Sequence, residues 1–104
     1  MNALEALADP TRRRIVELLV EGERSAGEIA AEFPTSRPGV SRHLRVLREH
    51  GLVRARDEGR RRLYSLDPAP LAELDNWLGR YRAFWANRLD ALETEIKRQQ
   101  RRTE

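Results

Sequence analysis

The segment from Ser36 to Gly51 reads SRPGVSRHLRVLREHG and combines a buried-helix pattern with an excess of positive charge. Val40, Leu44 and Leu47 are spaced i, i+4 and i+7, which places them on one side of a helix. The remaining positions carry four arginines and two histidines. The segment therefore predicts a helix that packs on a small core with one side and presents a cationic surface with the others.

The positive charge of the chain is concentrated in this region. Residues 36–66 hold nine arginines and three acidic residues, whereas the rest of the chain holds 11 basic and 14 acidic residues. The formal net charge of +3 thus conceals a basic block on a slightly acidic body. Such asymmetry favours a polyanion as the partner, and an arginine-rich solvated surface is the alternative.

Length and composition exclude several classes of protein. The 104 residues suffice for one domain, whose small core would gain from a second copy. The lack of cysteine excludes a disulfide framework and thiolate metal sites, and fits a reducing cytoplasm. No apolar run approaches the roughly 20 residues of a membrane span, and MNALEALADP lacks the pattern of a signal peptide. We therefore expect a cytoplasmic protein without membrane attachment.

Two helices are predicted in the first 22 residues. Residues 2–8 can form a short helix that buries Leu4 and Leu7. Asp9 and Pro10 then read as an N-cap followed by proline at the first helical position. This second helix should run to about residue 21 and end at Gly22. Its expected buried residues are Ile15, Leu18 and Leu19.

Capping signals predict the start of two further helices. Ser25 and Glu28 form the S-x-x-E pattern of a capping box. The apolar side of the helix that follows consists of Ile29, Ala30 and Phe33. After Pro34, Ser36 should cap the cationic helix, with Pro38 in its first turn, where a missing N–H costs little. Gly51 should end this helix.

The segment LVRARDEGRRRLYSL, which begins at Leu52, predicts a β-hairpin. Val53 and Ala55 share one face by the period of two that strands follow, and so do Tyr64 and Leu66. Residues 57–60, DEGR, read as the turn. The tip and the returning strand therefore carry Arg60, Arg61 and Arg62.

The rest of the chain predicts one long helix. From Pro70 to about Arg102 there is no further proline, and Gly79 is the only glycine. Apolar residues recur there in steps of three and four, which is a nearly heptad seam. About 30 helical residues would span about 45–50 Å, more than a body of this size can cover, so a second copy is the simplest partner. The expected dimer interface is Leu71, Leu74, Leu78, Tyr81, Trp85, Leu89, Leu92 and Ile96.

These elements predict a winged helix-turn-helix, mainly α with a small β-hairpin wing and a long C-terminal dimerisation helix. Residues 1–68 form the DNA-binding region and residues 69–104 the dimerisation helix, in one folding unit. The major groove of B-DNA admits one α-helix, and arginine pairs there with guanine. The candidate DNA contacts of the cationic helix are Ser36, Arg37, Gly39, Ser41, Arg42, His43 and Arg45.

Several candidate contacts have two possible roles. Gly39 either allows a close approach to DNA or is a tolerated weak position in a first turn. His43 either donates to a phosphate or packs at the groove face. Thr11 and Arg12 either bind phosphate at a helix N-terminus or are surface residues. The three wing arginines Arg60, Arg61 and Arg62 either enter a minor groove or neutralise phosphates, or they are solvated surface residues of a hairpin.

Four segments, in this order, carry a resemblance to a known family: ALADPTRRRIVELL, SAGEIAAEF, SRPGVSRHLRVLREHGLV and EGRRRLYSL. They resemble the ArsR/SmtB family of bacterial winged-helix repressors, and the resemblance covers residues 3–66. The family's recognition helix carries the pattern S-x-P-x-V-S-x-H-L-x-x-L, which matches residues 36–47. The tail LAELDNWLGRYRAFWANRLDALE resembles the branch with SdpR-type repressors, many of which lack a metal site. The resemblance implies a transcriptional repressor.

The family pattern also bears on metals and effectors. Thiolate sensors of the family place cysteines at the start of the third helix, where this chain has Ser25 and Gly27. Other members place aspartate and histidine along the last helix, but no histidine follows His50. We therefore expect no metal and no cofactor. Aromatic residues at helical spacing more often belong to a core or a subunit interface, and an effector pocket is the alternative. The effector, if one exists, stays unknown. The four residues concerned are Trp77, Tyr81, Phe84 and Trp85.

The resulting hypothesis is a homodimer that recognises a specific sequence in double-stranded DNA and represses by occupying promoter DNA. The two recognition helices should meet successive major grooves, roughly 34 Å apart, on an imperfect palindrome. The alternative is a winged-helix protein-interaction module whose C-terminal helix pairs with another protein. An enzyme is not expected, because the chain has no Gly-rich phosphate loop, no H-E-x-x-H and no credible acid–base pair.

Overall fold

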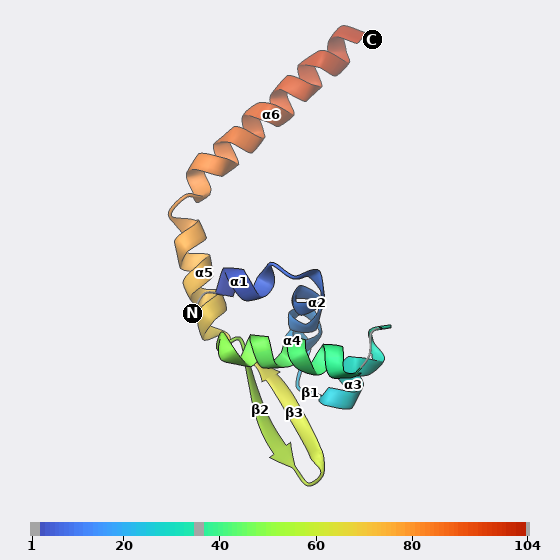
Figure 1. Cartoon of the computed structure of the whole chain (residues 1–104). Coiled ribbons are helices and arrows are strands. Elements are labelled where there is room, and N and C mark those ends of the chain that lie inside the picture. Colours follow the sequence, from blue (N-terminus) through green and yellow to red (C-terminus); the bar gives the residue numbers. More distant parts are fainter. Residues whose placement is uncertain (1–2, 35–36, 104) are drawn as a thin grey trace. The chain divides into compact units, whose positions relative to one another are not determined.

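The structure, a computed structural model, describes residues 3–34 and 37–103, with only the backbone for Arg37 and Thr103. Along these residues the order is α1 (Ala3–Leu7), α2 (Pro10–Val20), β1 (Arg24–Ser25), α3 (Ala26–Ala31), α4 (Arg37–Glu49), β2 (Val53–Glu58), β3 (Arg61–Leu66), α5 (Ala69–Gly79) and α6 (Arg82–Thr103) (Figure 1). The predicted mainly α fold with a hairpin wing is confirmed. The chain divides into two compact units, residues 1–74 and residues 75–104.

The predicted caps of α2 and α3 are confirmed. The Asp9 carboxylate accepts hydrogen bonds from the N–H groups of Thr11 (2.8 Å) and Arg12 (3.1 Å). Ser25 Oγ accepts from the Glu28 N–H at 3.1 Å, and Glu28 Oε1 accepts from the Ser25 N–H at 3.0 Å. Each cap satisfies backbone donors that a helix leaves without an acceptor, and so fixes where the helix begins.

The core of the first unit lies between α2, α3, α4 and the base of the sheet. Val40, Leu44 and Leu47 of α4 are at most 2% exposed, as their spacing predicted. The expected residues of α2 and α3 are buried or half-buried as well, and they are Ile15, Leu18, Leu19, Ile29, Ala30 and Phe33. The cationic helix is therefore fixed to the body along one side.

The expected burial of α1 is wrong at one position. Leu4 is 47% exposed, whereas Ala6 is fully buried and Leu7 is half-buried. A helix of five residues turns little more than once, so only one of its positions can point straight into the core. Here that position is held by Ala6, and Leu4 points elsewhere.

The sheet has three antiparallel strands in the order β1-β3-β2, and the two-residue strand β1 was not predicted. The hairpin register runs from Val53 opposite Leu66 to Glu58 opposite Arg61. The turn is therefore the pair Gly59–Arg60, two residues shorter than predicted. Gly59 has a φ of +62°, the left-handed conformation that a two-residue hairpin turn needs at this position.

The predicted continuous C-terminal helix is wrong, because the helix breaks between α5 and α6. At the break the N–H groups of Arg80 and Tyr81 bond to carbonyls three residues back, on Trp77 and Leu78. Gly79 precedes the break, and glycine costs a helix roughly 1 kcal/mol relative to alanine. In the described part of the chain, no helix is both long and apolar enough to cross a membrane.

Candidate nucleic-acid interface

The outward side of α4 presents free guanidinium groups. Ser41, Arg42 and Arg45 are exposed, and Gly39 is half-buried. Within the described residues Arg42 has no hydrogen-bond or ion-pair partner, and the acid nearest to Arg45 is Glu49, at 4.0 Å. Charges that are not neutralised inside the protein are the ones that an external polyanion can meet. Of the predicted contacts of this helix, Ser36 and the side chain of Arg37 lie outside what the structure describes.

One arginine of α4 was missed among the candidate contacts. Arg48 is exposed, one turn beyond Arg45, and its guanidinium has no partner in the part of the chain that the structure describes. The i, i+3 spacing places both side chains on neighbouring positions of the same helix surface. That spacing is the signal in the sequence, whereas the rule that residues near the N-terminus of a recognition helix usually reach the bases favours the first turns instead.

His43 faces α2 and not the open side of α4. Its Nδ1 lies 3.4 Å from Arg12 Nη1 and 4.0 Å from Asp9 Oδ1, and its side chain is 25% exposed. The other histidine, His50, lies 3.5 Å from a carboxylate oxygen of Glu5. Both histidines therefore face the N-terminal helices, His43 from α4 and His50 from the residue that follows α4.

The N-terminus of α2 is largely satisfied within the protein. Asp9 already accepts the N–H groups of Thr11 and Arg12. Burial raises the pKa of Asp9, but these hydrogen bonds and the charges of His43 and Arg12 outweigh it and lower the pKa. Arg12 also donates from Nε to the Ala6 carbonyl, at 2.6 Å. Arg12 Nη2 donates to the Glu5 carbonyl at 3.4 Å, and Nη1 lies 3.4 Å from His43 Nδ1, so each guanidinium nitrogen of Arg12 has a partner inside the protein. The Thr11 hydroxyl is thus the group left for a phosphate.

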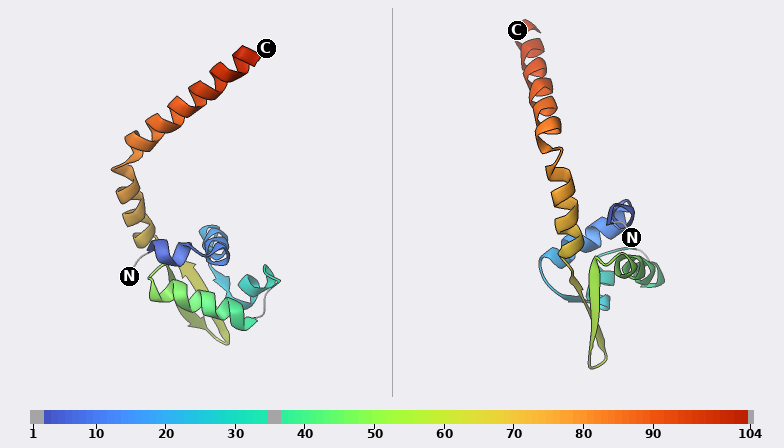
Figure 2. Two further views of the ribbon diagram at one scale, coloured as in Figure 1. Left: turned by 45° about the horizontal axis from the view of Figure 1, so that its top comes forward. Right: turned by 90° about the vertical axis from the view of Figure 1, so that its left-hand side faces the viewer.

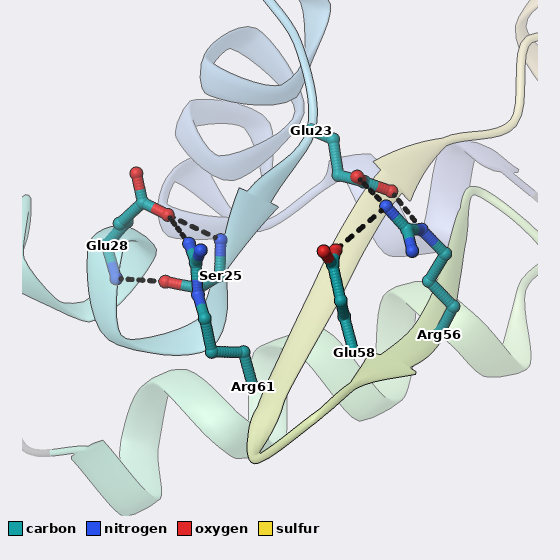
Figure 3. Close-up of polar contacts among 6 residues, drawn as sticks. All are labelled: Glu23, Ser25, Glu28, Arg56, Glu58 and Arg61. Carbon is teal, nitrogen blue, oxygen red and sulfur yellow. Dashed lines mark hydrogen bonds and ion pairs between the residues drawn. The ribbon is translucent and has the colours of Figure 1, made fainter.

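The three predicted wing arginines have different surroundings. Arg60 lies in the turn, exposed and without a partner among the described residues. The Arg62 guanidinium lies 6.0 Å from the centre of the Tyr64 ring. Arg61 forms an ion pair with Glu28 of α3 at 2.9 Å (Figure 3). Two of the three guanidinium groups are therefore free of acidic partners.

The structure describes no donor set for a metal. Among residues 3–34 and 37–103, no three histidine, cysteine or acidic side chains come together in a way that could hold an ion. At the positions where thiolate sensors carry cysteine, the Ser25 side chain serves as a helix cap and Gly27 has no side chain.

The predicted dimer interface divides between the two units. Leu71 packs against the core of the first unit and Leu74 is half-buried. The other six predicted residues are 40–57% exposed in the single chain, namely Leu78, Tyr81, Trp85, Leu89, Leu92 and Ile96. Across the described residues of α6 no side chain is buried. The apolar side of this helix is therefore uncovered.

The chain is similar to known regulators over most of its length. Residues 7–56 match a family described as a helix-turn-helix domain. The chain is 51% identical over 88 residues to the HTH-type transcriptional regulator Rv2034 of Mycobacterium tuberculosis, with 85% of this chain and 79% of that protein covered. It is 38% identical over 77 residues to the transcriptional repressor SdpR of Bacillus subtilis, with coverage of 74% and 86%.

Solved structures show the same relationship. One, described as a possible transcriptional regulator for arsenical resistance, has a TM-score of 0.75 and 47% identity, and covers 91% of this chain and 96% of its own. Another, described as an ArsR family transcriptional regulator, has a TM-score of 0.73 and 30% identity, with coverage of 80% and 91%. Family segments, winged fold and relatives agree, so this chain belongs to the ArsR family of helix-turn-helix transcriptional regulators.

Proposed function

We propose that this chain is a homodimeric transcriptional repressor that binds a specific sequence in double-stranded DNA. The side chains of α4 enter the major groove, where Arg42 and Arg45 read bases or hold phosphates. Arg60 and Arg62 of the wing contact the neighbouring backbone or minor groove. Occupation of promoter DNA by the dimer then blocks transcription by steric exclusion.

The observation that carries this proposal is the presence of arginines without acidic partners on both α4 and the wing. Arg42 and Arg48 on α4 and Arg60 at the wing tip lack acidic partners among the described residues, although acidic residues are plentiful elsewhere in the chain. Arginine offers a planar fork of donors that fits guanine and phosphate.

The dimer is supported by the exposed apolar side of α6. Leu89, Leu92 and Ile96 are about half exposed on a helix of 22 residues. A solvated helix has little stability of its own, so most helices gain it by packing an apolar face. A second copy gives two identical faces a closed, symmetric contact. It would also present two recognition helices to successive major grooves of an imperfect palindrome.

The repressive direction is supported by relatives and not by the chemistry of the residues. SdpR of Bacillus subtilis is named a transcriptional repressor, and a relative 40% identical over 77 residues, from Xylella fastidiosa, is named a biofilm growth-associated repressor. The competing hypothesis is a winged-helix protein-interaction module whose C-terminal helix pairs with another protein. For such a module the outward side of α4, along its described residues, offers charged side chains and no apolar patch. The free charges of that surface favour DNA.

The test is duplex binding as a function of salt. With the full chain and a labelled duplex of about 30 base pairs, log affinity should fall linearly with log salt, by about 0.9 for each phosphate contact. Six to ten contacts would remove about 10³–10⁵ of the affinity between about 50 and 200 mM salt. Absence of binding to any duplex, or affinity that ignores salt, would support the protein-interaction module instead.

A further inference from the structure

The wing separates its arginines by strand face. Cross-strand partners share a face of a sheet, and successive residues alternate between faces. Arg61 lies opposite Glu58, which is two residues from Arg56, so the three side chains share one face. Arg62 projects from the other face, as does buried Tyr64. The two faces therefore present their positive charge to different surroundings.

Both arginines of the first face bind acids that lie outside the hairpin. Arg61 Nη2 donates to Glu28 Oε1 at 2.9 Å. Arg56 donates from Nε and Nη2 to the two carboxylate oxygens of Glu23, at 3.0 and 2.7 Å. Figure 3 shows both pairs, with Arg61 at Glu28 in the first turn of α3 and Arg56 at Glu23, which precedes β1. Arg56 also forms an ion pair with Glu58 of the hairpin itself, at 3.3 Å. The bidentate contact with Glu23 fixes the orientation of the Arg56 guanidinium as well as its distance, because two parallel hydrogen bonds constrain the guanidinium plane.

The Glu28 carboxylate is itself fixed. Its Oε1 accepts the Ser25 N–H of the capping box as well as the Arg61 guanidinium. Hydrogen bonds from Ser25, and then the charge of Arg61, lower the pKa of Glu28, so the carboxylate is ionised at neutral pH. Arg61 is thus held by an acceptor that cannot swing away without the loss of a helix cap.

The outer part of the wing has little other support. The short strand β1 pairs only with Leu63 and Tyr64 of β3, so residues 57–62 form a two-stranded ribbon with exposed side chains. Two-stranded ribbons are marginally stable in water. In Figures 1 and 2 the hairpin projects from the body beyond β1. Arg56 lies opposite Leu63, the outermost residue of β3 that pairs with β1, and Arg61 lies two residues further out, in the ribbon. The two ion pairs therefore flank the point where the ribbon leaves the body.

We propose that Glu23 and Glu28 are positioning residues that hold the wing through Arg56 and Arg61, so that Arg60 and Arg62 meet the DNA. This inference rests on the proposed DNA binding. It gives Arg61 a contact within the protein, with Glu28, in place of a contact with DNA. Two of the three predicted wing arginines, Arg60 and Arg62, then remain as DNA contacts. The acids next to the wing then assist DNA binding, although their negative charge would by itself oppose it.

The test compares substitutions that remove one charge each, with the full chain, the duplex of about 30 base pairs and several salt concentrations. Glu28→Gln keeps the capping box, because glutamine serves there as well as glutamate. It weakens only the pair with Arg61. We expect Glu23→Gln and Glu28→Gln each to lower the affinity by up to about five-fold, with an unchanged salt slope. Arg60→Gln and Arg62→Gln should instead reduce the slope by about 0.9 each.

Glu32→Gln is the matched control for Glu28→Gln. It is the same chemical change one turn further along, at an exposed glutamate without an ion pair in the described part of the chain. Loss of a negative charge there should leave the affinity unchanged or raise it slightly, since DNA repels acids. A fall in affinity for Glu28→Gln but not for Glu32→Gln is the pattern that supports the positioning role of Glu28.

Two results of the DNA-binding comparison would overturn the inference. A rise in affinity and in salt slope for Glu28→Gln would mean that Arg61 is a phosphate contact that Glu28 restrains. A slope that falls by about 0.9 for Arg61→Gln would lead to the same conclusion. Both leave the proposed function intact, whereas a wild-type chain that binds no duplex overturns DNA binding itself.

A measurement without DNA separates a role of Glu23 and Glu28 in positioning the wing from a role in folding of the whole unit. Amide hydrogen exchange in the free protein should become faster at residues 57–62 in the Glu23→Gln/Glu28→Gln variant, while the core amides of α2 and α4 keep their protection. Unchanged exchange in the wing would contradict the proposed positioning role. Faster exchange throughout residues 3–74 would show that the two acids stabilise the whole unit and do not specifically position the wing.

Discussion

Helices α4 and α6 carry similar sequence patterns and have different surroundings. Both have leucines and other apolar residues at steps of three and four, with arginines between them. In α4 the apolar side is almost completely buried, with Leu44 1% and Leu47 0% exposed, whereas in α6 Leu89 and Leu92 are 55% and 57% exposed. The same periodicity thus describes a buried side in α4 and an exposed side in α6.

The difference shows what an apolar stripe can and cannot predict. Periodicity identifies the side of a helix that must leave water, but it does not identify the surface that covers it. For α4 the cover consists of α2, α3 and the sheet of the same chain. For α6 we propose a second copy. If that is right, changes on the two helices should affect different quantities, namely the folding of the chain and the association of two chains.

The largest effect is expected for the combined change Leu78→Glu and Leu89→Glu. Burial of a leucine is worth roughly 1.5–3 kcal/mol, and a symmetric dimer would lose four such side chains. Sedimentation should therefore show monomers, and DNA binding should become weak because two half-sites no longer act together. Dimers of unchanged affinity would place the interface elsewhere on the chain.

Leu44→Ala should destabilise folding by about 2–5 kcal/mol, because it opens a cavity in a packed core. Urea unfolding followed by circular dichroism measures this loss. The matched control is Leu92→Ala in the monomeric Leu78→Glu/Leu89→Glu background, where an exposed leucine should change stability by less than about 0.5 kcal/mol. Equal losses at the two positions would remove the contrast between the helices.

Arg42→Ala should weaken binding to a preferred duplex by about 1–3 kcal/mol and relax the sequence preference, if Arg42 reads a base. A fall that is equal on all duplexes would instead make Arg42 a phosphate contact. Arg98→Ala, on α6, is the control for the loss of one positive charge, and it should leave affinity nearly unchanged. Fluorescence anisotropy with matched and mismatched duplexes separates these outcomes.

Asp9 should make folding stability depend on acid pH. Its pKa is lower in the folded chain than in the unfolded one, so its contribution is present above the unfolded value of about 4 and is lost as the pH falls through the folded value. Asp9→Ala should cost about 0.5–2 kcal/mol near pH 7 through loss of the cap. Asp9→Asn keeps a capping acceptor and should flatten the profile, measured as urea midpoints between about pH 7 and pH 3. A profile as steep as that of the wild type would assign the pH dependence to other acids.

Gly79→Ala should have the smallest effect. An added Cβ would meet no atom within 4 Å, and alanine favours a helix by up to about 1 kcal/mol over glycine. The expected result is a slight gain in helix content by circular dichroism, with α5 extended toward α6. A measurable loss of helix would mean that the break at Arg80 and Tyr81 is required by the assembly.

Much of the fold followed from local signals. The caps Asp9 and Ser25 and the stripe Val40, Leu44, Leu47 act within a few residues of one another, so the sequence displays them directly. The break after Gly79 was missed because one weak helix former does not decide a helix by itself. Leu63 shows a further limit of the strand pattern. The period of two places it on the face opposite to Tyr64, yet both side chains are buried. Its strand lies between two others and also contacts α2 and α3, so residues of both faces are buried.

The candidate interface was less accessible to prediction. A count of arginines does not reveal which of them are paired, and the pairs of Arg61 with Glu28 and of Arg56 with Glu23 join residues 33 positions apart. His43 likewise meets Arg12 across 31 positions. Such contacts depend on the tertiary fold, so the sequence predicts a basic surface but not which of its charges are free.

The most direct test of the account is selection of bound duplexes from random DNA by the full-length chain. Two copies that each present α4 and a wing should enrich an imperfect palindrome, with half-sites about one helical turn apart, roughly 34 Å between centres. Enrichment of a single unrepeated half-site, or no enrichment at all, would contradict the proposed paired recognition helices.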